Sequence, residues 1–262
     1  MLALDGYWET LSKDPTTGLY RWHDQLESGS DNLITSQCPS VLGEGPESGP
    51  DANAKCWVAS DAYTLASTDI AVWLYREKIA LATFLTTFGD AANAKKIRAS
   101  AAELKAAVNA HLWDDRTGSW LAYNTSSRMV IAAQTHLLAL PVFAGNPDSV
   151  GGIGVHSSGH SSSAAATTGI ASASQARRAW NLLSQPAMLS TFGVRSASSD
   201  DPRYAGSGNY VKPYSNWRGP IWVNTNIMLA YGFADFGMKR YLLTSLLTYF
   251  LTSLLTYLLT YL

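Results

Sequence analysis

Residues 21–32, with the sequence RWHDQLESGSDN, bring three carboxylates close together: Asp24, Glu27 and Asp31. A carboxylic acid that donates a proton near neutral pH needs a raised pKa, which an apolar lining or a second carboxylate can provide. Gly29 permits a tight turn from which Asp31 can project into a pocket while Glu27 stays near. The segment is therefore a candidate for general acid catalysis by Asp31. The alternative is a solvated turn with ordinary charges.

A second segment, YSNWRGPIW at residues 214–222, combines two indole rings with a guanidinium. Trp217 and Trp222 can stack on the C–H face of a sugar, and Arg218 can hold two hydroxyls or a carboxylate with its fork. Gly219 lets the backbone approach a ligand closely, and the proline after it suits the first turn of a helix. The alternative for this segment is a buried aromatic helix start with a paired arginine.

Helical periodicity indicates the elements that must position these segments. Strand signals are slight, apart from a turn and short extended piece over 114–124. About six helices are expected, joined by loops that carry most of the aromatic and acidic residues, so the sequence predicts an all-α fold. The predicted helices span 61–89, 92–114, 131–143, 174–185 and 221–237, and residues 2–14 resemble the last turns of another helix.

The composition narrows the class of ligand. The chain has 262 residues, of which 47% are hydrophobic, enough for a sizeable core. A net charge of -1 gives no basic surface for phosphates, so nucleic acid is not expected as a partner. Nine Trp and thirteen Tyr suit a pocket for a neutral, amphipathic ligand. The histidines form no cluster beyond His156 and His160, so neither a metal nor a cofactor is predicted.

The cysteines and the amino terminus bear on the compartment. Cys38 and Cys56 flank a Gly/Pro-rich stretch. The two cysteines either form a disulfide that closes this stretch or remain separate thiols. The first residues contain no charged-then-apolar signal sequence. A cytoplasmic location is the default expectation.

Two biased segments divide the chain. Residues 144–170 are rich in Gly, Ser and Ala, which predicts a flexible surface insertion in a domain over 1–237. Residues 238–262 form a tail of Leu/Thr/Tyr blocks that repeat every four residues, the pattern that translated simple-sequence DNA produces, and this tail is expected to lie outside the fold. A membrane anchor is the alternative, because residues 242–262 are uncharged and long enough to span a bilayer.

Other charged residues give weaker signals. Arg76, on the helix predicted over 61–89 that also holds Asp69, is expected in a structural ion pair rather than in contact with substrate. Arg195, Asp200 and Asp201 either border the pocket or belong to a solvated loop.

Together the two segments resemble the six-hairpin glycosidases of glycoside hydrolase family 63, the group of processing α-glucosidases and mannosylglycerate hydrolases. The likeness covers most of residues 4–237 and follows the family order. Its motifs are GLYRWHDQLESGSDN, STDIAVWLYREKIALA, LWDDRTGSWLAYN, STFGVRSASSDDPRY and YSNWRGPIW. Trehalases share related SG-x-D and WRGP elements.

The resemblance implies a partial (α/α)6 barrel that inverts an α-glycosidic bond in an oligosaccharide or small glycoside. Asp31 matches the general acid of the family. The residues expected to bind the sugar, or to support those that do, are Trp22, His23, Asp24, Glu27, Asn32, Trp217, Arg218, Gly219 and Trp222.

The sequence also departs from the family. Inversion requires a second carboxylate about 6.5 to 9.5 Å from the acid, and in the family this base is a Glu well downstream of the WRGPIW element. After Trp222 the only acidic residue here is Asp235, and six helices are about half of those in such a barrel. We therefore expect a fragment that keeps the acid, lacks the base and has little activity alone. The alternatives are a non-catalytic carbohydrate-binding remnant and a protein anchored to a membrane by its tail.

Overall fold

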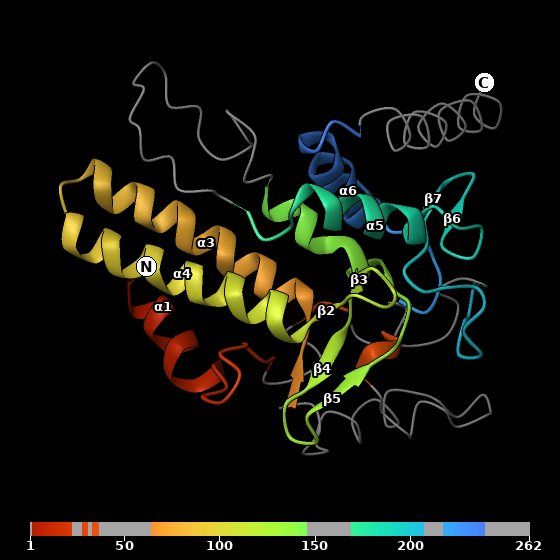
Figure 1. Ribbon diagram of the computed structural model, residues 1–262, viewed down its shortest axis with the longest axis horizontal. Coiled ribbons are helices and arrows are strands. Elements are labelled where there is room, and N and C mark those ends of the chain that lie inside the picture. Colours follow the sequence, from red (N-terminus) through yellow and green to blue (C-terminus); the bar gives the residue numbers. More distant parts are fainter. Residues whose placement is uncertain are drawn as a thin grey trace, which may run out of the picture.

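The computed structural model describes residues 2–22, 28–30, 33–36, 64–145, 169–206 and 217–238. Helices account for most of this part of the chain, which confirms the all-α prediction (Figure 1). They are α1 (Leu2–Tyr7) with the π-helical turn η1 (Trp8–Ser12), the 3-10 turn η2 (Ile34–Ser36), α3 (Thr68–Thr87), α4 (Ala91–His111), the 3-10 helix η5 (His136–Ala144), α5 (Ala173–Leu183) and α6 (Val223–Asp235).

Short antiparallel strands connect the helices. A three-stranded sheet has the order β1 (Leu65–Ala66), β4 (Ala122–Asn124) and β5 (Met129–Ile131). Two hairpins pair β2 (Trp113–Asp114) with β3 (Ser119–Trp120), and β6 (Leu189–Ser190) with β7 (Gly193–Val194). In the first hairpin the Gly118 amide donates to the Asp114 carbonyl at 2.8 Å. The turn predicted at the start of 114–124 is therefore present.

Helices α3 and α4 form a long antiparallel pair at one side of the molecule (Figure 1). Gly89 makes the turn between them with a φ of 84°, a conformation that costs glycine little. Asp90 then caps α4 by accepting a hydrogen bond from the Asn93 amide at 3.1 Å. Beside this turn the two helices pack through a cluster of aliphatic side chains that includes Leu81 and Ile97.

The central packing element is η5, which contacts α3, α5 and α6. The sequence predicts a helix over 131–143, and this prediction is wrong about where the helix begins. Ile131 ends β5, the helix begins at His136, and it is a 3-10 helix. Thr135 caps its first turn, and Pro141 lies inside it without an amide to donate. Its apolar residues are buried between neighbouring helices, so tertiary packing determines the local conformation.

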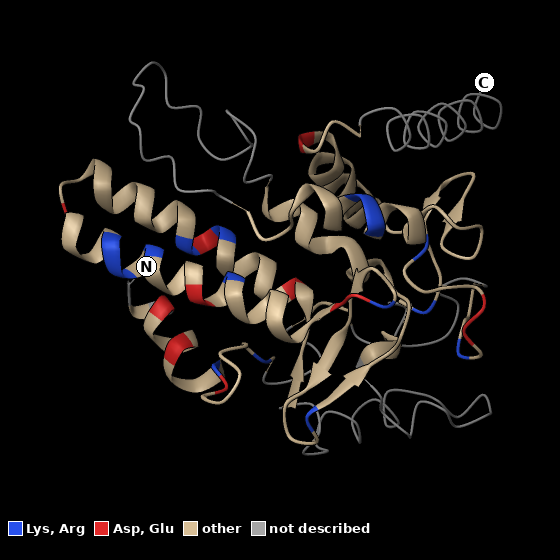
Figure 2. Ribbon diagram, in the orientation of Figure 1, with Lys and Arg blue, Asp and Glu red and all other residues tan. Residues whose placement is uncertain are grey.

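A buried ion network holds α1 and η1 against the α3–α4 pair. Lys78 is 1% exposed, forms an ion pair with Asp5 and lies 2.8 Å from Glu9 Oε1. The same oxygen accepts hydrogen bonds from the Ser100 hydroxyl at 2.5 Å and from the Tyr20 hydroxyl. Figure 2 shows these acidic positions on α1 and η1 beside the α3–α4 pair. The network thus fixes the chain just before residues 21–32, which we call the acid-bearing segment.

Several predictions concern residues outside the described ranges. They include Cys38, Cys56, most of the predicted insertion and all but the first residue of the tail. The two ends of the insertion, Ala144 and Ile170, are buried. Within the described ranges no helix is both long and apolar enough to cross a membrane. In the same part of the chain no three metal-ligating side chains come together.

Candidate functional site

The predicted site residues divide into those that the structure describes and those that it does not. Trp22, Trp217, Arg218, Gly219 and Trp222 are described. The roles of the others remain predictions, because these residues lie outside the described ranges: His23, Asp24, Glu27, Asp31 and Asn32.

The chain on either side of Asp31 is described and enters the core. Gly29 has a φ of 66°, so the tight turn that the sequence predicts at this glycine is present. Ser30 is buried, and its carbonyl accepts a hydrogen bond from the Leu33 amide at 3.0 Å. Leu33 is 3% exposed and belongs to the main hydrophobic cluster, as does Trp217. The chain around the predicted acid and the second motif therefore share one core.

Trp22 is half-buried at the start of the acid-bearing segment. Its indole N–H donates to Asp69 Oδ1 at 3.3 Å, and its ring meets the edge of Trp8 with the centroids 6.1 Å apart. These two contacts fix both the plane and the direction of the indole. Its orientation therefore depends on the helices behind it.

Asp69, in the first turn of α3, is a buried carboxylate that sequence reasoning did not place in the site. Its Oδ1 accepts hydrogen bonds from the Ser67 hydroxyl and from the Ile70 amide at 2.8 Å, besides that from Trp22. Burial raises the pKa of Asp69, while these hydrogen bonds act in the opposite direction. The next residue back, Thr68, donates its hydroxyl to the Leu137 carbonyl of η5 at 2.7 Å. The first turn of α3 thus joins the Trp22 side to the element that carries His136.

The second motif contains two stacked indoles, Trp217 and Trp222, which form a tryptophan wall. Trp217 and Trp222 are stacked with their rings nearly parallel, at 4° and 4.2 Å between centroids. His136 lies against Trp217 at 5.6 Å. Trp217 is only 5% exposed, whereas Trp222 is partly exposed. The buried ring is therefore the foundation of the wall, and the Trp222 side is the part closer to solvent.

His136 is neutral in this environment. Burial lowers the pKa of His136 to about 4, although its contact with a backbone carbonyl acts in the opposite direction. Nδ1 lies 3.2 Å from the Ser196 carbonyl oxygen, which can only accept, so Nδ1 carries the proton. A neutral ring beside Trp217 can pack without the cost of a buried charge.

The Arg-Gly-Pro turn is held by the loop after β7. The Gly219 amide donates to the Ser196 hydroxyl at 2.9 Å, and the Ser196 amide donates to the Pro220 carbonyl at 3.1 Å. Gly219 has a φ of 152°, and a Cβ there would collide with the Tyr204 ring, at 2.8 Å from Cδ2. The close approach that the sequence predicts at Gly219 is therefore to Tyr204 of the protein itself.

Arg218 is a half-buried cation beside a second arginine. Burial and the charge of Arg203 both lower the pKa of Arg218, and Asp201 acts in the opposite direction. Asp201 itself forms an ion pair with Arg203 at 2.8 Å. Among the weaker candidates, Asp201 thus lies close enough to Arg218 to influence its charge. Arg195 instead donates to the Pro186 carbonyl at 2.9 Å.

Two further charged residues can be compared with their predictions. Arg76 donates to the Phe143 carbonyl at 2.6 Å and lies over its ring at 4.1 Å, with Asp235 as a nearby charge. Arg76 therefore packs α3 against η5 through a carbonyl oxygen and an aromatic ring, whereas the prediction was a structural ion pair. Asp200 is exposed, as in a solvated loop.

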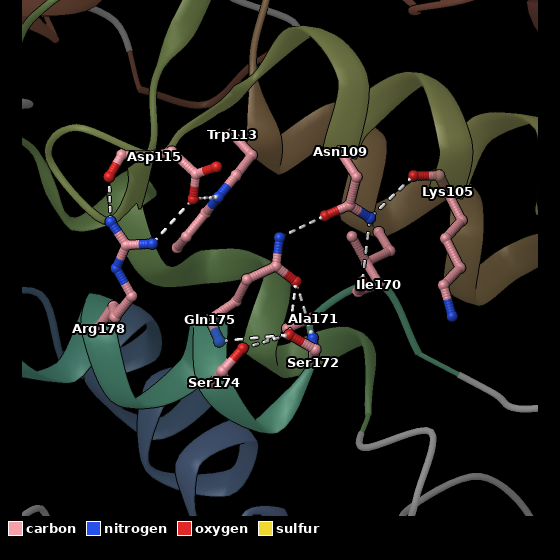
Figure 3. Close-up of a pocket in the computed structure, with 10 residues that line it drawn as sticks. All are labelled: Lys105, Asn109, Trp113, Asp115, Ile170, Ala171, Ser172, Ser174, Gln175 and Arg178. Carbon is pink, nitrogen blue, oxygen red and sulfur yellow. Dashed lines mark hydrogen bonds and ion pairs between the residues drawn. The ribbon is translucent and has the colours of Figure 1, made fainter.

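A separate open pocket of about 420 Å³ lies between α4, α5 and the β2–β3 hairpin (Figure 3). Its polar groups bind one another: Gln175 donates to Asn109 at 2.8 Å, and Arg178 donates to Asp115 at 2.8 Å. The Trp113 ring is covered by the Arg178 guanidinium at 5.3 Å. None of the predicted site residues lines this pocket, so we place the candidate site at the tryptophan wall.

Comparisons with known proteins give a family and related structures. A family model described as the mannosylglycerate hydrolase MGH1-like glycoside hydrolase domain matches residues 1–256. A mannosylglycerate hydrolase of Thermus thermophilus is 29% identical over 129 residues, which is 48% of this chain and 23% of that protein.

Solved structures show a similar fold. The GH63 mannosylglycerate hydrolase of Thermus thermophilus superposes with a TM-score of 0.69 in its complex with Tris and 0.68 in its complex with glucose, each at 18% identity. These matches cover 94% of this chain and 59% and 56% of those chains. Neutral trehalase Nth1 of Saccharomyces cerevisiae superposes at 0.52 and 16% identity, over 90% of this chain and 47% of that one. The expected partial (α/α)6 architecture is therefore confirmed.

Proposed function

We propose that this chain, which belongs to the mannosylglycerate hydrolase MGH1-like glycoside hydrolase family, binds an α-glycoside at the tryptophan wall. In this proposal Asp31 is the general acid of an inverting hydrolysis. The substrate is an oligosaccharide or a small glycoside, and no cofactor or metal takes part. The chain spans about 59% of the solved mannosylglycerate hydrolase that it resembles, so its activity is inferred and not given by the family alone.

One observation carries the proposal. Leu33, which lies just after the predicted acid, packs in the same hydrophobic cluster as Trp217, although the two motifs are far apart in sequence. Trp22, at the start of the acid-bearing segment, packs against that cluster as well. Both ends of the acid-bearing segment are therefore anchored in the core that also contains Trp217. The hydrogen bonds from Arg203 to the Ile34 carbonyl and from the Ala205 amide to the Arg218 carbonyl support a short path between Asp31 and a sugar bound at the wall.

Each described side chain has a role in this proposal. Trp222 offers an indole surface near solvent for the C–H face of a sugar, supported from behind by Trp217. Arg218 supplies N–H donors for sugar hydroxyls or a carboxylate. Asp31 must be neutral before it can protonate the departing glycosidic oxygen, and an apolar lining would favour that form of the carboxylic acid.

The base is the part of the mechanism that the sequence supports least. An inverting hydrolase activates its water with a second carboxylate, and Asp235 is the one acidic residue after Trp222 in this sequence. Asp235 ends α6 and is a neighbouring charge of Arg76. We therefore propose that the 262-residue chain binds the sugar and turns it over slowly or not at all. This feature also favours the second candidate, a non-catalytic carbohydrate-binding protein.

The experiment pairs a turnover assay with a binding titration. p-Nitrophenyl α-D-glucoside and α-D-mannoside are the substrates, and D-glucose is the ligand for calorimetry. Turnover that Asp31→Asn abolishes, with glucose binding retained, supports the enzyme. Binding without turnover supports the carbohydrate-binding candidate. Asp200→Asn, changed at an exposed carboxylate, is the matched control and should leave both readings unchanged. Neither binding nor turnover in the wild type would contradict the proposal.

A further inference from the structure

The two halves of the candidate site are joined by a short segment that neither motif contains. Residues 201–205 follow β7 and run between the 3-10 turn η2 and the Arg-Gly-Pro turn. The family resemblance implies that STFGVRSASSDDPRY, residues 190–204, is a pocket loop, and within residues 201–205 only Asp201 is singled out, as either a border of the pocket or part of a solvated loop.

The contact toward the acid-bearing segment is made by Arg203. Its Nη1 donates to the Ile34 carbonyl at 2.9 Å. Ile34 is 4% exposed and follows directly on Leu33, so this carbonyl lies close to Asp31 in sequence. A charged donor on a carbonyl makes a stronger hydrogen bond than a neutral one.

Arg203 is itself held rigidly. Asp201 Oδ1 accepts from Arg203 Nε at 2.9 Å, and Asp201 Oδ2 accepts from Nη2 at 2.8 Å, which is the bidentate geometry. The backbone amide of Arg203 also donates to Oδ1 at 2.9 Å. The guanidinium therefore has one orientation, with its remaining nitrogen on Ile34.

The contacts toward the tryptophan wall come from the next two residues. Tyr204 packs where Gly219 has no side chain, and the Ala205 amide donates to the Arg218 carbonyl at 2.7 Å. Consecutive residues thus contact the Arg-Gly-Pro turn on one side and η2, which directly follows the acid-bearing segment, on the other.

We propose that Arg203 is a positioning residue that sets the distance between the acid-bearing segment and the tryptophan wall, with Asp201 fixing its fork. The effect on sugar affinity rests on the proposed function, whereas the effect on the acid-bearing segment does not. Loss of the Arg203–Ile34 hydrogen bond would let residues 28–36 move relative to Trp222 and Arg218.

The test uses the full chain and measures hydrogen–deuterium exchange, glucose affinity and melting temperature. Arg203→Met should raise the opening equilibrium of peptides covering 28–36 by about tenfold, the scale of one hydrogen bond to a charged group. Arg203→Lys keeps the charge but not the fork, so it should not restore wild-type exchange. Asp201→Asn keeps the arginine but weakens the carboxylate that fixes its orientation. This variant replaces Arg203→Met in the test if Arg203→Met does not fold, and it should raise exchange in the same peptides.

Arg195→Met is the matched control, because Arg195 lies in the same loop and donates to a different carbonyl, that of Pro186. At a temperature where all variants are folded, glucose affinity should fall in the Arg203 variants and stay unchanged in the Arg195 variant. Exchange in 28–36 that matches the Arg195→Met control, or full rescue by Arg203→Lys, would overturn the proposal. If exchange rises but no variant, including the wild type, binds glucose, the positioning role stands and the proposed function fails.

Discussion

At Gly219 a single missing side chain allows two parts of the site to meet. The residue has a φ of 152°, and the Tyr204 ring occupies the space where a Cβ would lie. Gly89 also has a positive φ, of 84°, but nothing lies within 4 Å of its missing Cβ. Comparing substitutions at Gly219 and Gly89 therefore separates the cost of backbone strain from the cost of steric collision.

We expect Gly219→Ala to destabilise the fold by about 3 kcal/mol, through strain and collision together. Gly89→Ala should cost about 1 kcal/mol, because only the backbone strain is present. Urea unfolding of both variants at neutral pH measures the difference. Equal losses would show that Tyr204 moves aside freely, and the close packing of the Arg-Gly-Pro turn would then not constrain the site.

Titration of the single residue His136 makes the stability of the fold depend on pH. In the unfolded chain a histidine titrates near 6.5, whereas burial lowers the pKa of His136 to about 4 in the folded protein. Between these values the unfolded state binds more protons, so stability falls as the pH falls through this window.

The loss attributable to His136 should reach about 3 kcal/mol between pH 6.5 and pH 4. Urea unfolding of the wild type and of His136→Gln across this range measures it, since glutamine does not titrate and other groups are common to both proteins. The stability difference between the two should shrink as the pH falls. A difference that stays constant with pH would contradict a neutral, buried His136.

Among the elements, α1 and η1 depend on one buried lysine of α3. Burial would raise the pKa of Glu9, but hydrogen bonds from Lys78, Ser100, Tyr20 and Lys13 outweigh it and lower the pKa to about 2. A carboxylate with a lowered pKa contributes stability above its unfolded value near 4.5, and that contribution is lost as the pH falls toward 2. Attachment of α1 and η1 is therefore sensitive to strong acid.

We expect Lys78→Met to destabilise the protein by about 3 kcal/mol, because Asp5 and Glu9 lose the cation between them. Lys13→Met is the matched control. Lys13 pairs with Glu9 at 3.0 Å and with Glu103 at 3.3 Å, but it is partly exposed, so its loss should cost about 1 kcal/mol or less. Thermal unfolding compares them. Equal losses would mean that burial of Lys78 adds nothing to the attachment of α1.

How far the sequence predicts these elements depends on how local their causes are. α4 and most of α3 follow from apolar periodicity, Gly89 and the Asp90 cap, all of which are visible in a single segment. The helix predicted from residue 61 begins only at Thr68, because Leu65–Ala66 pair with β4 as β1. η5 differs from its prediction because Ile131 is taken into β5 and Pro141 removes an amide. These depend on strand pairing and burial by other helices, which periodicity alone does not report.

The same reasoning explains which site residues were found. Trp217 and Arg218 stand in a motif whose residue types suggest sugar binding. Asp69, His136 and Arg203 become part of the site only through partners distant in sequence: Trp22, Trp217 and the Ile34 carbonyl. No local signal in the sequence shows that Asp69 would face an indole.

At the scale of the whole molecule, the fold brings distant segments to one place. The first turn of α3 contacts Trp22 through Asp69 and η5 through Thr68. The segment 201–205 contacts η2 and the Arg-Gly-Pro turn. The acid-bearing segment is therefore attached at both ends to elements that also support the tryptophan wall. This arrangement is the basis for placing Asp31 at a sugar site.

The most direct test is a crystal structure of this chain grown with D-glucose, in which the Asp31 carboxylate is located relative to the bound sugar. We predict glucose against the Trp222 ring, with an Asp31 oxygen within about 2.6 to 3.2 Å of a sugar oxygen or joined to it by one water. An Asp31 carboxylate directed into solvent on another face, with Trp222 and Arg218 out of its reach, would contradict this prediction.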